Sequence, residues 1–137
     1  MSAAAIQTAG IILVVLPTVV WGGVTILRLS ILRRDPYLRD NPLRRRLWIA
    51  GHAHAGVLLV LSLVVLVLLQ YADLPGWWER VAGSSIPLAA VLFAVAFFLS
   101  VLRGDATRPN GLIDLAYVAA VLVAIGTLTA GIGLLRA

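Results

Sequence analysis

Two histidines lie two residues apart inside a long apolar stretch of this sequence. His52 and His54 occur in the run LWIAGHAHAGVLL, and the chain of 137 residues has no other histidine. An ionisable side chain within an apolar span is energetically costly, so it marks a candidate functional site. Imidazole can ligate haem iron or copper, and it can also exchange protons near neutral pH. This motif is therefore the first place to expect chemistry.

The spacing of the two histidines limits what they can do together. On an α-helix, residues i and i+2 project about 200° apart. His52 and His54 therefore cannot both face one partner, and they cannot serve as the two axial ligands of a single haem. The chain contains no Cys, which excludes disulfides, thiolate metal sites and a cysteine nucleophile.

The elements that must position these side chains are membrane spans. Apolar residues make up 61% of the chain and charged residues 12%, against about 45–50% and about 25% in soluble domains. The apolar residues form long runs, each near the ~20 residues that cross a bilayer. We expect an all-α, polytopic transmembrane four-helix bundle in a single domain, 1–137, with spans at 6–27, 47–70, 85–102 and 111–135.

The distribution of arginine predicts the orientation of the bundle. All 11 basic residues are Arg, of which seven lie in the first connection and two in the third. The positive-inside rule then places both connections in the cytoplasm and both termini outside, N-out and C-out. We expect a multi-pass protein of the cell membrane, in particular a bacterial plasma membrane. The charge lies between spans, so it indicates contact with the lipid bilayer and excludes a nucleic acid as partner.

Polar side chains gather in the predicted cytoplasmic half of the bundle. Counting inward from the cytoplasmic end of each span places seven of them at similar depth: Trp21, Thr25, His52, His54, Ser100, Asp114 and Tyr117. At the rim, Arg44, Arg45 and Arg46 could bind a carboxylate, a phosphate or a lipid headgroup. The sequence thus predicts a polar pocket here. The alternative is a set of interfacial side chains that only bond neighbouring helices, with Asp114 favouring the positive end of its own helix.

Small residues predict how the helices pack, because they let backbones approach closely within a membrane. On span four, Ala116, Ala120 and Ala124 recur every four residues, and Gly126 and Ala130 continue the pattern. On span two the corresponding residues are Gly51 and Ala55. Pro87 is expected in the first turn of span three, where amides lack helical acceptors in any case.

The segment Gly51-His52-Ala53-His54-Ala55-Gly56 resembles a motif of haem–copper oxidase subunit I-like proteins. The chain is also similar to small four-span membrane proteins of unknown function with a His-x-His run in the second span. The likeness extends loosely to FFLS at 97–100, RPN at 108–110 and GIGLLR at 131–136.

This resemblance implies that one histidine ligates a b-type haem, or that both contribute to a copper or haem site, with the propionates near Arg44, Arg45 and Arg46. The only Met is Met1, at the opposite end. A second axial ligand would come from Tyr117, from a second copy or from another subunit.

Several function classes stay open at this stage. The first is a non-enzymatic small subunit or assembly component of a larger membrane complex, either a homo-oligomer or a partner of other membrane subunits. The second is a haem- or copper-binding redox protein that uses His52 and His54. The third is a small oligomeric transporter or proton pathway. An enzyme acting on lipids ranks last, because no nucleophile–base pair, carboxylate pair or phosphate-binding loop occurs at suitable spacing.

Overall fold

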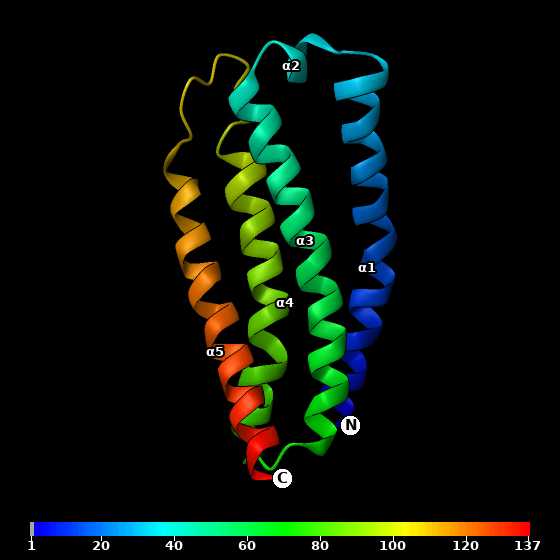
Figure 1. Cartoon of the computed structure of the whole chain (residues 1–137), viewed down its shortest axis with the longest axis vertical. Helices are drawn as coiled ribbons and strands as arrows, with labels where there is room; N and C mark the ends of the chain where they lie inside the picture. The colour runs from blue at the N-terminus through cyan, green and yellow to red at the C-terminus, as the bar shows by residue number, and fades with distance from the viewer. Residues whose placement is uncertain (1) are drawn as a thin grey trace.

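The structure, a computed structural model, describes residues 2–137, which form five α-helices and no strand. Four helices are long and apolar enough to cross a membrane: α1 (Ala3–Leu27), α3 (Pro42–Leu68), α4 (Gly76–Leu99) and α5 (Leu115–Arg136). They run side by side along the long axis of the molecule (Figure 1). The predicted all-α four-helix architecture is confirmed.

Short elements join or extend these helices. α1 continues into a π-helical segment, η1 (Arg28–Leu32), and the short helix α2 (Pro36–Arg39) precedes α3. One turn of 3-10 helix, η2 (Leu69–Tyr71), extends α3, and another, η3 (Gly111–Asp114), leads into α5. Asn41 begins α3 as its N-cap, because its side chain accepts a hydrogen bond from the Arg44 amide at 2.9 Å.

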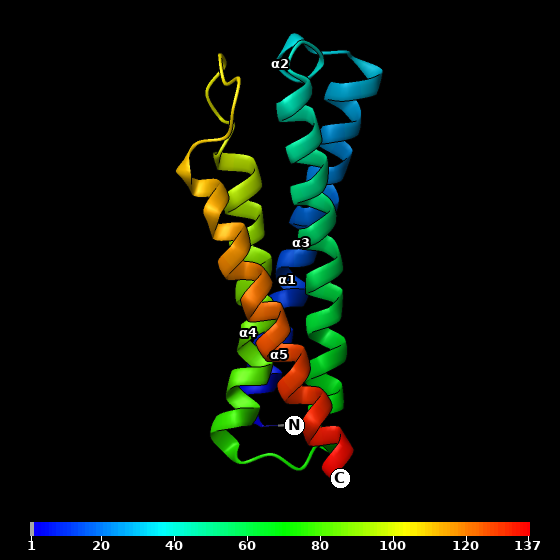
Figure 2. The ribbon, with the colours of Figure 1, turned by 60° about the vertical axis from the view of Figure 1, so that its left-hand side comes forward.

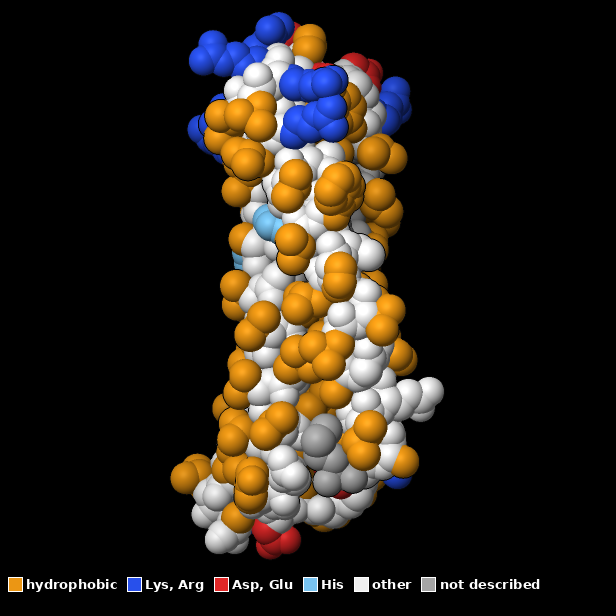
Figure 3. All heavy atoms as spheres, turned by 90° about the vertical axis from the view of Figure 1, so that its right-hand side faces the viewer, with side chains coloured by type: hydrophobic (Ala, Val, Ile, Leu, Met, Phe, Trp, Pro, Cys, Tyr) orange, Lys and Arg blue, Asp and Glu red, His pale blue; other side chains and the backbone are white. Residues whose placement is uncertain are grey.

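The two ends of the bundle differ in chemistry. Both termini lie at one end, and α2 and the connection between α4 and α5 lie at the other (Figure 1). Basic side chains crowd the second end, whereas apolar side chains are scattered along the face shown in Figure 3, with imidazole visible below the basic end. We call the end that holds both termini the terminal end, and the end with the basic side chains the Arg-rich end. By the positive-inside rule, the Arg-rich end is predicted to face the cytoplasm.

α4 lies between α3 and α5 and packs most extensively with both, whereas α1 packs mainly against α3. In the half of α4 toward the terminal end, residues 82–90 include several small buried side chains, among them Ala82 and Ala89. Toward the Arg-rich end α4 carries Phe93, Phe97 and Phe98 instead. The ribbon of α5 diverges from that of α3 toward the Arg-rich end (Figure 2). Small residues thus allow close packing in the half of α4 toward the terminal end. Toward the Arg-rich end Gly51 of α3 also approaches α4 closely, since a β-carbon there would lie 2.9 Å from Cβ of Phe97.

The third span begins earlier than predicted. α4 starts at Gly76, nine residues before position 85, and ends at Leu99. Its first turns consist of Trp77, Trp78, Glu79 and Arg80. These aromatic and charged residues lower the local apolarity, so a search for apolar runs misses this part of the helix. Pro87 therefore lies inside the helix, and its predicted place in the first turn is wrong. Lacking an amide hydrogen, Pro87 leaves the Gly83 carbonyl without its usual helical donor.

The packing face of α5 also differs from the prediction. Ala120 and Ala124 are exposed, whereas Ala119, Gly126, Ala130 and Gly133 are buried. The four-residue alanine stripe is therefore not the contact face. Glycine at 126 allows the contact with α4, because a β-carbon there would lie 2.7 Å from Cγ1 of Ile86. The predicted burial of Gly126 and Ala130, and of Gly51 and Ala55 on α3, is confirmed.

Candidate functional site

His52 lies between α3 and α1, half-buried against the Gly22–Gly23 pair. A β-carbon at Gly23 would come within 2.6 Å of the His52 Nε2 atom, whereas at Gly22 the nearest ring atom, Nδ1, would be 4.0 Å away. The imidazole thus occupies the space that a side chain at Gly23 would need. No residue of the described chain, 2–137, makes a hydrogen bond to its ring.

A small apolar cavity of about 210 Å³ adjoins the His52 ring. It is lined by residues of three helices: Thr18, Val19, Gly22, His52, Ala55, Ala94 and Phe98. The only other polar side chain in this lining, Thr18, donates its hydroxyl to the Val15 carbonyl at 2.7 Å. The ring therefore contributes the one unengaged polar group of the cavity.

His54 faces a different neighbour. Its ring lies against α4. The centroid of the His54 ring is 4.8 Å from the centroid of the Phe93 ring and 5.3 Å from that of the Phe97 ring. Its Nδ1 is 2.8 Å from the Ala50 carbonyl oxygen. A carbonyl can only accept, so this contact assigns a proton to Nδ1, and in the neutral imidazole Nε2 then carries the lone pair. The residue is exposed on the side of the bundle.

The two imidazoles diverge, as the helical spacing predicts. His52 contacts α1 and His54 contacts α4, so the rings do not share one ligand position. Within residues 2–137, no group of three or more His, Asp or Glu side chains is placed to hold a metal ion.

The other predicted members of the polar pocket lie apart from the imidazoles. Asp114 and Tyr117 are exposed near the start of α5, which packs mainly on α4, and neither bonds an imidazole. Trp21 is also exposed, and Thr25 donates its hydroxyl to the Trp21 carbonyl at 2.9 Å. Ser100 is buried at the end of α4. The structure thus brings no carboxylate or phenol to either histidine.

Arg44 has a role that the sequence did not indicate. Its side chain is 2% exposed, and its guanidinium lies 4.0 Å from the centroid of the Tyr37 ring. The guanidinium donates to four backbone carbonyls: Val101 at 3.0 Å, Tyr37 at 2.7 Å, Gly104 at 3.0 Å, and Arg103. Three of these acceptors lie in the connection that follows α4. A cation is also favoured at that end of the helix dipole.

Two further side chains join the same region. The Tyr37 hydroxyl donates to the Leu102 carbonyl at 3.1 Å, and Asn41 Nδ2 donates to the Ala106 carbonyl at 2.8 Å. We call Tyr37, Asn41 and Arg44 the inner clasp. It binds the first connection to the third. The grouping of Arg44 with Arg45 and Arg46 as an anion-binding rim is revised accordingly, because four of the five N–H groups of Arg44 are already engaged, whereas Arg45 and Arg46 remain exposed.

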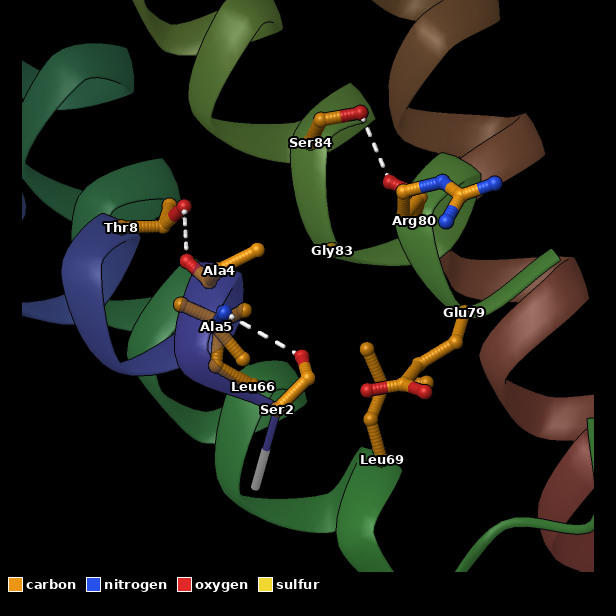
Figure 4. Close-up of a pocket in the computed structure, with 10 residues that line it drawn as sticks. All are labelled: Ser2, Ala4, Ala5, Thr8, Leu66, Leu69, Glu79, Arg80, Gly83 and Ser84. Carbon is orange, nitrogen blue, oxygen red and sulfur yellow. Dashed lines mark hydrogen bonds between the residues drawn. The ribbon is translucent and has the colours of Figure 1, made fainter. Parts of the chain in front are cut away.

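A second cavity, of about 260 Å³, lies at the terminal end, and none of the predicted site residues lines it. The start of α1, the end of α3 and the start of α4 form its walls (Figure 4). The Glu79 side chain extends beside Leu69, and the Arg80 guanidinium points away from α1 (Figure 4). The hydroxyls of Thr8 and Ser84 bond carbonyls of their own helices. Glu79 is thus the one charged group directed into this cavity.

Comparisons with protein-family models, with curated protein sequences and with solved structures gave no match to this chain.

Proposed function

We propose that this chain is a non-enzymatic subunit of a larger membrane complex and that the His54 face of α3 binds a neighbouring subunit. This face consists of His54 and Val57 of α3 together with Phe93 and Phe97 of α4. The observation that carries the proposal is an exposed imidazole at bilayer depth. His54 lies eight residues beyond Arg46, which is about 12 Å along a helix rising about 1.5 Å per residue.

The energetics of the imidazole favour a partner over lipid. The Nδ1 proton is already bonded to the Ala50 carbonyl, so only the Nε2 lone pair is left to accept a hydrogen bond. Hydrocarbon supplies no donor, and a polar group without a partner there costs free energy. A hydroxyl, amide or indole N–H from a neighbouring transmembrane helix would satisfy Nε2. Membrane helices use such polar contacts together with close packing to associate.

Photo-crosslinking in native membranes tests this proposal. A photo-reactive amino acid at position 57 reports on the His54 face, because Val57 is 67% exposed and lies one helical turn beyond His54. The matched control is position 128, since Leu128 on α5 is 65% exposed. We expect a discrete adduct with another membrane subunit from position 57, no such adduct from position 128, and loss of the adduct in His54→Ala. Equal adducts from both positions, unaffected by His54→Ala, would reject the proposal.

A second candidate, a haem- or copper-binding redox protein, is supported by the tautomer of His54. Metal-ligating histidines commonly donate one ring N–H to a carbonyl while the other nitrogen binds the metal. The Nδ1 contact with Ala50 and the adjacent rings of Phe93 and Phe97 suit His54 as one axial ligand. Haem would supply electron transfer when bound, and the chain's own part would be to hold the imidazole. The second ligand would come from another subunit or copy.

Absorption spectra separate the two candidates. The protein is purified from haem-replete cells as wild type, His54→Ala and His52→Ala. Haem ligation predicts a Soret band in the wild type and in His52→Ala but not in His54→Ala. Without a Soret band or bound copper in the wild type, the redox candidate is rejected, while the crosslinking result still decides the first proposal.

A further inference from the structure

The end of α1 and the start of α3 enclose a basic pocket at the Arg-rich end. Its volume is about 360 Å³, and its lining residues are Ser30, Ile31, Arg34, Arg39 and Arg45. Three arginine residues therefore line one hollow. The inner clasp does not use any of these side chains, and the pocket is separate from both imidazoles.

The backbone around this pocket departs from regular helix in two places. Residues Arg28–Leu32 wind as π-helix, a form that is frequent at functional sites. Arg34 then adopts φ 48°, in the left-handed region that non-glycine residues seldom occupy. Such a conformation is energetically unfavourable and persists only where the surroundings fix it. Asp35 follows, its amide bonded to the Leu29 carbonyl at 2.8 Å, which fixes the chain on the far side of Arg34.

The charge of the pocket is only partly neutralised. Arg39 is paired with Asp40, with Nε 2.5 Å from Oδ1. Throughout residues 2–137, neither Arg34 nor Arg45 has an acidic side chain within ion-pair distance. Two guanidinium groups thus retain their positive charge around the hollow. Guanidinium is the cation best suited to phosphate, because its N–H groups can donate to two oxygens at once.

The three consecutive arginines at the start of α3 point in different directions. Successive helical residues are rotated by about 100°. Arg44 therefore reaches the carbonyls after α4, Arg45 lines the basic pocket, and Arg46 lies outside that lining. Similarly, Arg34 lines the pocket and its neighbour Arg33 does not. The chain thus contains exposed arginines of equal charge inside and outside the pocket.

We propose that this pocket binds the phosphate group of an anionic phospholipid in the leaflet at the Arg-rich end. Apolar side chains adjoin the charges, since Ile31 lines the pocket at 63% exposure and the next residue, Leu32, is 71% exposed. A phospholipid presents the same sequence of chemistry, a phosphate above an apolar glycerol and acyl region. A free phosphate ion would use the guanidinium groups but would gain nothing from Ile31 and Leu32. The lipid is therefore the favoured source of the phosphate.

Native mass spectrometry of the detergent-purified full chain tests the assignment. The probe is phosphatidylglycerol, with phosphatidylcholine and inorganic phosphate as comparison ligands. The test variants are Arg34→Gln and Arg45→Gln, and the matched controls are Arg33→Gln and Arg46→Gln. We expect about tenfold weaker retention of phosphatidylglycerol in each test variant, as for loss of a charge-assisted contact, and little change in the controls. Arg45→Lys should retain more phosphatidylglycerol than Arg45→Gln, because lysine keeps the positive charge but cannot donate to two phosphate oxygens at once.

Three results would overturn the proposal. Equal losses in all four glutamine variants would indicate general surface charge instead of a site. Equal retention of phosphatidylcholine and phosphatidylglycerol would show that the anionic headgroup is not selected. Displacement of the lipid by inorganic phosphate would identify a soluble anion as the ligand. Thermal unfolding of each variant in the same detergent establishes that the folds compared are intact.

Discussion

The Nε2 atom of His52 lies so close to Gly23 that a β-carbon at that glycine would come within 2.6 Å of it. Gly23→Ala is therefore predicted to displace the ring or α1 and to lower the free energy of unfolding by about 1–3 kcal/mol, as overpacking does. The measurement is thermal unfolding in detergent. Gly22→Ala is the matched control, because its nearest ring atom would be 4.0 Å away.

A double substitution makes this prediction specific. Adding His52→Ala to Gly23→Ala removes the ring that the new β-carbon meets, so most of the lost stability should return. Both Gly→Ala changes alter helix propensity equally, and the comparison cancels that effect. Equal stabilities for Gly22→Ala and Gly23→Ala would show that His52 does not occupy this space.

Arg44 is predicted to stabilise the fold through geometry as well as charge. Arg44→Lys keeps the charge but cannot donate along the diverging directions of a guanidinium to the Val101, Tyr37 and Gly104 carbonyls. We expect a loss of about 2–4 kcal/mol in the free energy of unfolding. Arg46→Lys, at an exposed site in the same turn, should unfold like the wild type. If both variants behaved alike, the inner clasp would contribute no stability.

The α4–α5 contact depends on glycine at 126. Gly126→Ala would bring a β-carbon to 2.7 Å from Ile86 Cγ1 and should destabilise the protein by about 1–3 kcal/mol. Ile86→Ala in the same chain should recover part of this loss. Gly131→Ala on the same helix has nothing within 4 Å of the new β-carbon and should be tolerated. Chemical denaturation in mixed micelles measures all three, and a tolerated Gly126→Ala would contradict the packing.

The orientation of the bundle in the membrane can be tested by labelling introduced cysteines, because the chain has no Cys of its own that would react. We expect a membrane-impermeant maleimide to label Ala137→Cys in intact cells and to label Thr107→Cys only after permeabilisation. Both residues are exposed, so access from each side of the membrane decides the outcome. The reverse pattern would place the Arg-rich end outside and contradict the positive-inside prediction.

Arg39 and Asp40 form an exposed pair in the first connection. The hydrogen bond from Arg39 lowers the pKa of Asp40 below its ordinary value. Arg39→Gln should therefore raise the pKa of Asp40, and a carboxyl-carbon NMR titration measures the change. A depressed carboxyl pKa adds stability above the unfolded-state pKa, and that stability is lost as pH falls through the folded-state pKa. Because both side chains are exposed, unfolding at neutral pH should hardly change. An unchanged Asp40 pKa would contradict the pairing.

The sequence predicted the four-helix architecture well because apolar runs of about 20 residues are typical of membrane-spanning helices. It correctly predicted that the two histidines face different directions, since residues i and i+2 project about 200° apart whatever the rotation of the helix. Which ring meets α1 could not be predicted, because α3 is apolar around its circumference and periodicity leaves its rotation undetermined. The proximity of Gly23 to His52 involves two different spans, so no local pattern indicates it.

The sequence-based predictions that the structure contradicts also failed for physical reasons. The sequence predicts a late start for span three because Glu79 and Arg80 lower the apolarity of the first turns of α4. The alanine stripe at 116, 120 and 124 was a plausible contact face, but glycines on another side of α5 allow closer packing against Ile86. Arg44 was assigned with its neighbours because charge alone does not distinguish a guanidinium that binds carbonyls from one that faces solvent.

The burial of Arg44 also constrains the order in which the protein can be completed during synthesis. Three of its acceptor carbonyls belong to Val101, Arg103 and Gly104, more than fifty residues later in the chain. While α4 is still being translated, the guanidinium has only the Tyr37 carbonyl available and must remain hydrated at the membrane surface. The closure of this end of the bundle by Arg44 therefore waits for the connection after α4 to emerge.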